Sequence, residues 1–274
     1  MFTIRPPAVF WMGLAFGVAL SGCGLKAKRA DLVLVNGAEP ESLDPAILTG
    51  QPEVRLANAL FEGLTTFDRK GRSVPGMAES WTISSDRKTY TFRLRADAKW
   101  SDGVPVTAGD FVASWRRMLT PATAAPNNYQ LFYVRNAKAF ANGKLADFSQ
   151  VGVRALDDRT LEVQLGNPTP FFLDLCATPP LQPVPLRVIE REGDDWIKPG
   201  RIVTNGAYLL EAWRINDRIR LRRNPLYWDR AHVALETVDV LPIANSLAGA
   251  TGTDFTITMG LTSALLSHRF DAGG

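Results

Sequence analysis

Cysteine and histidine are scarce in this 274-residue chain, which has two of each. Cys23 and Cys176 lie in such different surroundings that we expect no disulfide between them, and one pair could not form a disulfide framework. His232 and His268 have no cysteine or carboxylate at metal-ligand spacing, so the sequence predicts no metal site. Cys176 lies among apolar residues and is predicted to be a small buried hydrophobe rather than a reactive thiol.

A strong charge imbalance and the common catalytic motifs are also lacking. The 31 basic and 28 acidic residues leave a net charge of +3, and the basic residues are mostly scattered, so we expect no nucleic-acid partner. The chain has no GxxxxGK[ST] or GxGxxG loop, no HExxH motif and no nucleophile elbow. Two carboxylate pairs, Asp157 with Asp158 and Asp194 with Asp195, fit solvated turns better than general acid–base work. The sequence therefore predicts neither an enzyme nor a bound cofactor.

Long apolar runs are lacking too, apart from a short one near the start of the chain. The run from Ala8 to Leu20 would make roughly 20 Å of helix, which is short of the roughly 30 Å bilayer core. Arg5 precedes it and small residues follow, so residues 1–22 have the layout of a signal peptide. The run leads into Leu-Ser-Gly-Cys, which is similar to a bacterial lipobox and predicts that Cys23 is lipidated; an ordinary cleavage site is the alternative. We expect a chain tethered by its lipid to a membrane, on the periplasmic or extracellular side.

Hydrophobic periodicity in the remaining chain predicts a mixed α/β architecture rather than a run of βαβ units. Alternation or short buried runs predict strands at 32–35, 89–95, 151–155, 161–165, 207–213, 218–223 and 238–242. One helix is predicted from Pro52 to Gly63, with the glycine as its stop, and another follows Thr107, which forms a capping box with Asp110. Prolines crowd residues 168–185, which we interpret as a stiff crossover between lobes without a regular element.

Eight sequence motifs, in order along the chain, resemble those of one known family. They are EPESLDP at 39–45, LFEGL at 60–64, PGMAESW at 75–81, TFRLR at 91–95, KWSDGVPVTAGDF at 99–111, KPG at 198–200, NGAY at 205–208 and RNPLYW at 223–228. In these segments the chain is similar to the periplasmic oligopeptide-binding proteins of ABC importers, within bacterial extracellular solute-binding protein family 5. The residue types in these motifs indicate mainly structural roles, because the glycines allow tight turns of the backbone and the tryptophans anchor turns.

The resemblance implies a periplasmic-binding-protein-like fold of type II, represented by its N-terminal lobe or lobes only. It implies a first segment of lobe I at 23–60, a family-specific extra domain at 61–185 and a second segment of lobe I at 186–245. Relatives continue from there into a second lobe, whereas residues 246–274 are expected to be an aberrant, disordered, low-complexity tail. We therefore expect a truncated form of the receptor, and a non-functional gene fragment is compatible with this assignment.

The resemblance also implies a function, that of a monomeric receptor that captures oligopeptides and delivers them to the permease subunits of an ABC importer. Dipeptides, nickel chelates or another small solute are the alternative ligands within the family, and a lipoprotein hydrolase is the enzyme alternative. In the family, the segment before the first helix bonds to the peptide backbone, which points to Thr49, Gly50 and Gln51, with Asn127 as a further contact. The alternative interpretation of this tripeptide is a glycine turn before a helix that starts with proline.

The lipid anchor can be tested by replacing the cysteine that is expected to carry it. Expressed in a bacterium, the chain should incorporate labelled fatty acid and partition into detergent, and Cys23→Ser should abolish both, because serine offers no thiol for acylation. Cys176→Ser is the matched control and should label as the unmodified chain does. Equal labelling of the Cys23→Ser chain would contradict the prediction.

Overall fold

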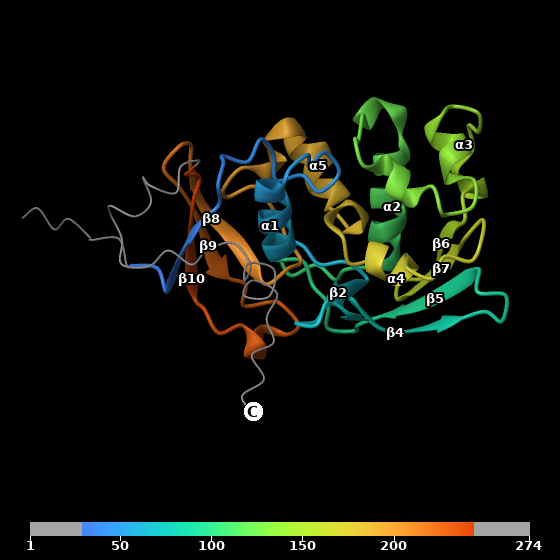
Figure 1. The fold of residues 1–274 in the computed structure, drawn as a ribbon, viewed down its shortest axis with the longest axis horizontal. Helices are drawn as coiled ribbons and strands as arrows, with labels where there is room; N and C mark the ends of the chain where they lie inside the picture. The colour runs from blue at the N-terminus through green and yellow to red at the C-terminus, as the bar shows by residue number, and fades with distance from the viewer. Residues whose placement is uncertain (1–28, 244–274) are drawn as a thin grey trace, which may run out of the picture.

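The computed structural model describes residues 29–243 of the chain (Figure 1). The predicted signal peptide, Cys23 and the tail at 246–274 lie outside the described residues. Within residues 29–243, no helix has both the length and the apolar character needed to cross a bilayer. The architecture is mixed α/β, as the sequence predicted, with several separate sheets.

The strands form three sheets, and the two larger ones lie at opposite ends of the molecule in Figure 1 with α1 between them. The first has the order β1 (Leu32–Val35), β10 (Thr237–Leu241), β9 (Arg218–Arg223), β8 (Tyr208–Arg214). The second has the order β4 (Ala78–Ile83), β5 (Thr89–Leu94), β7 (Thr160–Gln164), β6 (Val153–Asp157). The small third sheet pairs β2 (Thr65–Phe67) with β3 (Ser73–Pro75).

The helices cover these sheets, and most of them are short. The α-helices are α1 (Gln51–Leu60), α2 (Ala108–Leu119), α3 (Ala137–Ala141), α4 (Phe172–Leu175) and α5 (Leu186–Glu192). Single 3-10 turns are η1 (Pro121–Thr123), η2 (Asn128–Leu131), η3 (Phe148–Gln150), η4 (Pro179–Leu181), η5 (Gly193–Ile197) and η6 (Arg230–His232). Helix α1 packs on β8 of the first sheet, and α2 packs on β6 and β7 of the second.

The first sheet contains the strands predicted at 207–213 and 218–223, which form a hairpin, and it joins distant parts of the chain. Ile219 and Leu221 are fully buried between arginines on β9, as the alternation predicted. Asn216 adopts φ 58° in the hairpin turn, a conformation that asparagine tolerates better than most residues. Strand β1 pairs parallel to β10, with Leu34 opposite Val240, so the sheet closes only when residues about two hundred positions apart meet.

Helix α2 and strands β5, β6 and β7 of the second sheet also follow the predicted pattern, whereas β4 was not predicted. Thr107 and Asp110 make both hydrogen bonds of the capping box at the start of α2. Phe111 and Trp115 are buried on the face toward the sheet. The Trp115 indole also donates from Nε1 to the Leu181 carbonyl at 3.0 Å, which satisfies the polar atom of a buried tryptophan.

Two predictions about breaks in structure were wrong. Helix α1 ends at Leu60 rather than at Gly63. Gly63 instead allows a close backbone contact, because a Cβ there would lie 2.1 Å from the Cys176 carbonyl oxygen. The proline-rich stretch also contains regular elements, α4 and η4. Two of its prolines precede α4, two begin η4 and two follow η4, so none of them interrupts α4 or prevents η4.

The core is continuous from one large sheet to the other. Buried side chains from both sheets belong to a single hydrophobic cluster. Leu181, in the predicted crossover, is completely buried. The proline-rich stretch therefore packs as part of the core, and the boundaries predicted between lobe and extra domain stay a prediction.

Candidate functional site

The loop that leads into α1 is anchored by a buried carboxylate. Asp44 is 3% exposed, and its Oδ1 accepts a hydrogen bond from the Ala46 amide at 3.0 Å. Arg117 of α2 donates from Nη1 to Oδ1 at 3.1 Å and from Nη2 to Oδ2 at 2.6 Å. A bidentate arginine–carboxylate pair fixes orientation as well as position. The loop is therefore held against α2.

A second link joins this loop to Asn127, one of the predicted site residues. The Asn127 side chain donates from Nδ2 to the carbonyl oxygen of Leu48 at 2.8 Å. Leu48 is buried and directly precedes Thr49. The structure therefore brings the two predicted parts of the site, 49–51 and Asn127, to the same place.

The predicted tripeptide lies where α1 begins, and Gly50 in its middle has an extended backbone. Thr49 and Gln51 are exposed and Gly50 is half-buried. Gly50 is the N-cap of α1, with φ −134° and ψ 170° and no side-chain capping bond. Extended backbone can offer its N–H and C=O groups to a second extended chain, as at the edge of a sheet.

Two apolar side chains near this backbone were not predicted from the sequence. Ile47 is 38% exposed and Tyr129 is 56% exposed. Ile47 lies just before Thr49, and Tyr129 lies just after Asn127 in η2. Exposed isoleucine and tyrosine side chains add apolar area that can contact the side chains of a ligand.

Gly50 has a steric role of its own beside Glu53. Glu53 is 4% exposed, and its Oε1 accepts a hydrogen bond from the Glu41 amide at 3.1 Å. A Cβ on residue 50 would lie 2.7 Å from Glu53 Oε2, so any side chain there would displace the carboxylate. The interpretation of Gly50 as a structural turn residue thus has direct support, and it is compatible with a role in binding.

A second polar cluster surrounds Glu62, where the chain leaves α1 for β2. Its Oε1 accepts from the Tyr227 hydroxyl at 2.8 Å and its Oε2 accepts from Trp228 Nε1 at 2.6 Å. Asn205 binds both main-chain groups of Glu62: Oδ1 accepts from the amide at 3.2 Å, and Nδ2 donates to the carbonyl at 2.9 Å. We call this cluster of Glu62, Asn205, Tyr227 and Trp228 the Glu62 junction.

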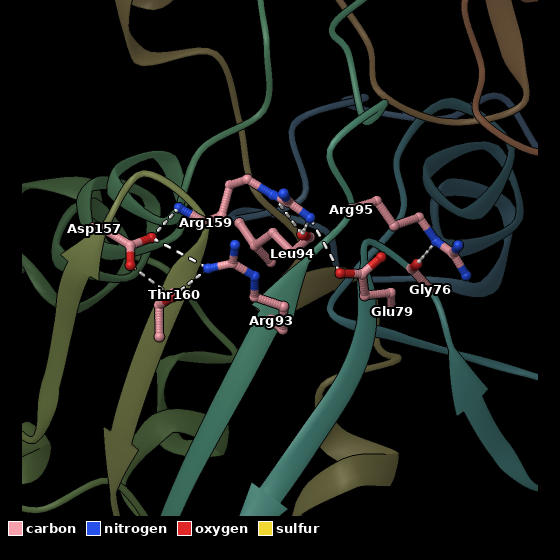
Figure 2. Close-up of polar contacts among 8 residues, drawn as sticks. All are labelled: Gly76, Glu79, Arg93, Leu94, Arg95, Asp157, Arg159 and Thr160. Atoms are coloured by element: carbon pink, nitrogen blue, oxygen red, sulfur yellow. Dashed lines mark hydrogen bonds and ion pairs between the residues drawn. The ribbon is translucent and has the colours of Figure 1, made fainter.

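The Glu62 junction extends to the second sheet through Arg95. The Arg95 guanidinium lies 3.4 Å from the centre of the Trp228 ring, a cation–π contact. Its Nε donates to the Gly76 carbonyl at 2.7 Å, as Figure 2 shows. In the same view Arg159 donates from Nη2 to the Leu94 carbonyl at 2.9 Å and to Glu79 Oε1 at 3.1 Å. These contacts connect the ends of β4, β5 and β7 to the region around Glu62.

The environment of Glu62 changes its acidity. Burial raises the pKa of this carboxyl from 4.5 to about 7, although the hydrogen bonds from Trp228 and Tyr227 oppose the shift. A cavity of about 50 Å³ adjoins the carboxyl, lined also by Gln182 and Asn58. Gln182 Oε1 is buried there and has no hydrogen-bond partner among residues 29–243. Ordered water fits a polar cavity of this size.

The sequence matches a known family over much of its length. Residues 72–252 match the bacterial extracellular solute-binding proteins, family 5, middle region. The chain belongs to this family. It is 47% identical to the periplasmic oligopeptide-binding protein OppA of Escherichia coli (strain K12) over 223 residues, which is 81% of this chain and 41% of that protein.

Solved structures of family 5 proteins show the same fold. The crystal structure of Haemophilus influenzae OppA in complex with RPPGFSPFR is 44% identical with a TM-score of 0.77, covering 81% of this chain and 44% of that one. The unliganded open form of the periplasmic murein tripeptide-binding protein MppA is 42% identical with a TM-score of 0.77, covering 82% and 43%. This chain therefore spans less than half the length of the family 5 proteins that it matches.

The family 5 motifs LFEGL, PGMAESW, NGAY and RNPLYW meet at or beside the Glu62 junction. Sequence reasoning treated them as separate scaffold motifs and did not single out Glu62. The available signal was a carboxylate inside the otherwise apolar LFEGL segment. Such a residue is rarely buried without partners.

The described residues offer little for metal or thiol chemistry. Among residues 29–243, no group of three or more His, Cys, Asp and Glu side chains is arranged to hold a metal ion. Cys176 is fully buried, as predicted, and burial raises the pKa of its thiol well above the usual range. A thiol in that state is a poor nucleophile.

Glu62 should make the stability of the fold depend on pH. Between pH 4.5 and about 7 the folded chain holds a proton on Glu62 that the unfolded chain has lost, so the free energy of unfolding falls as pH rises through that window. The free energy of unfolding is lowered by about 3 kcal/mol in total, and this loss is complete above pH 7. Glu62→Gln cannot titrate. Urea unfolding should therefore show the variant gaining stability relative to the unmodified chain, by up to about 3 kcal/mol, between pH 4.5 and 8.

Glu190→Gln is the control for this measurement, because it makes the same chemical change at an exposed position of α5. Its stability should stay parallel to that of the unmodified chain. A constant difference between Glu62→Gln and the unmodified chain across the pH range would show that the proton on Glu62 is not linked to folding.

Proposed function

We propose that this chain is part of a non-catalytic receptor that captures oligopeptides outside the cytoplasmic membrane and supplies them to an ABC importer. The observation that carries the proposal is the extended backbone of Gly50 between exposed Thr49 and Gln51, tied to Asn127 through Leu48 in a fold shared with peptide-binding relatives. We further propose a monomer that is attached to the membrane by a lipid on Cys23 and meets the permease subunits of the importer.

The arrangement suits ligands of varied sequence. Main-chain hydrogen bonds do not depend on the side chains of the peptide, so an extended backbone edge recognises peptides as a class. Ile47 and Tyr129, close in sequence to Thr49 and Asn127, supply exposed apolar contact area. The two ties from Asp44 and Asn127 keep the edge in place before the ligand arrives, which lowers the entropy lost on binding.

Other family ligands are the competing assignment. A probable deoxycholate-binding periplasmic protein of Escherichia coli, YgiS, is 43% identical to this chain, and the dipeptide-binding protein DppE of Bacillus subtilis is 36% identical. Overall identity therefore does not separate the ligand classes. The extended backbone favours peptides, since a steroid has no repeating amide groups to pair with it. Dipeptides and nickel chelates remain alternatives that a binding panel would distinguish.

The proposal predicts how a peptide binds to the described face. In NMR titrations of the full chain, a mixture of tri- to pentapeptides should shift the amide signals of residues 49–51. The described residues can contact a peptide from one side only, which leaves an extended peptide half solvated. We therefore expect dissociation constants above the micromolar range. Peptides N-methylated at alternate residues should bind several-fold more weakly, because they lose main-chain donors. Gln51→Ala should have little effect, because it keeps the backbone.

Asn127→Ala should weaken binding several-fold, because it releases the Leu48 carbonyl from its side-chain tie. Asn128→Ala is the matched control at the next position and should bind as the unmodified chain does. Equal affinity for plain and N-methylated peptides would contradict recognition through the backbone. Shifts produced by deoxycholate and not by peptides would favour the other ligand class.

A further inference from the structure

A shallow groove at the end of the molecule that carries α3 is lined by basic side chains. Its volume is about 420 Å³, and Arg135, Lys138 and Lys144 contribute to its walls. All three are exposed, and no acidic residue lines the groove. Within the described part of the chain, none of the three forms an ion pair. The groove therefore presents an uncompensated positive charge to whatever occupies it.

The backbone beneath these charges is fixed. The Arg135 amide donates to the Gln164 carbonyl at 2.9 Å, and the Arg135 carbonyl accepts from the Gly152 amide at 2.9 Å. Asn136 donates from Nδ2 to the Gln150 carbonyl at 2.8 Å. These bonds hold the segment before α3 against β7 and the turn before β6. The backbone that carries Arg135 is thus fixed before any partner binds, which lowers the entropy cost of binding.

Exposed aromatic rings adjoin the same groove. Phe132 lines it directly, and Gly166, which also lines it, donates its amide to the Tyr133 carbonyl at 2.9 Å. Tyr133 is 41% exposed and Phe171 is 44% exposed, and their rings meet edge to face with centres 5.2 Å apart. Neither ring is among the lining residues of the groove, but the Tyr133 backbone lies next to it; we call Tyr133 and Phe171 the aromatic rim.

We propose that the basic groove and the aromatic rim form a docking surface for membranes that contain anionic phospholipid. Lysine and arginine side chains bind phosphate-bearing headgroups, and each basic residue near such a surface strengthens binding roughly fivefold. Aromatic rings settle at the level of the headgroups. A soluble phosphate would use the charges alone, so the aromatic rim is what selects a membrane as the partner. This surface is separate from the peptide-facing loop and does not depend on the proposed function.

Vesicle sedimentation tests the proposal with the full chain. Vesicles of equal parts phosphatidylcholine and phosphatidylglycerol should bind the chain more tightly than phosphatidylcholine alone, and added salt should weaken the difference. Lys138→Glu combined with Lys144→Glu should reduce binding to the anionic vesicles roughly tenfold or more. Tyr133→Ser combined with Phe171→Ser should weaken binding to them while leaving its salt dependence unchanged, because it removes no charge.

The matched control is Lys70→Glu combined with Arg222→Glu, which makes the same change in net charge at exposed positions away from the groove. All variants share the same first 28 residues, so any contribution of that segment to binding cancels. The control should bind anionic vesicles as the unmodified chain does, apart from a small uniform loss. Equal binding by the groove variant and the unmodified chain would overturn the proposal. An equal loss in the control would also overturn it, as would saturable binding of glycerol phosphate in the groove without vesicle binding.

Discussion

The two hydrogen bonds between the main chain of Glu62 and the side chain of Asn205 are the contact on which the rest of the described fold depends. They join the chain leaving α1 to the segment that enters β8, across 143 positions of sequence. The approach is so close that a Cβ on Gly206 would lie 2.6 Å from the Leu60 carbonyl carbon. Tyr227 and Trp228 cover the same point, and Arg95 extends the contact to the second sheet. Because these groups are buried, each lost partner would leave an expensive unpaired polar atom.

The loop before α1, which we propose faces the peptide, is supported because α1 is held at both ends. The Glu62 junction fixes its C-terminal end, and the Asp44–Arg117 pair together with Asn127 fixes the loop before its N-terminal end. An extended edge on a rigid support can bind backbone without first becoming ordered, which is the usual requirement for a precise site. The scaffold motifs therefore support the segment that we propose binds the peptide.

Local features of the fold could be predicted from the sequence because they depend on near neighbours. The alternation of Ile219 and Leu221 with arginines and the capping box of Thr107 with Asp110 are complete within a few residues. The positions of 49–51 and Asn127 followed from the family resemblance, and the structure brings them together. Gly63 was misread because its reason, the nearby Cys176 carbonyl, lies more than one hundred positions away. The short helix α4 was missed because the prolines suggested no regular element, although all of them fall outside its interior. The Glu62 junction was missed because, as for Gly63, the contacting residues lie more than one hundred positions away in sequence.

Hydrogen exchange in an Asn205→Ala chain tests most directly whether the Glu62 junction holds the two large sheets together. The substitution leaves the amide and the carbonyl of Glu62 unpaired in a buried setting, which should cost about 2–5 kcal/mol. If the account is correct, amides of β5 in the second sheet and β9 in the first lose protection together and by similar amounts. Loss of protection in β9 with β5 unchanged would contradict the account, because the sheets would then be stable independently of the junction.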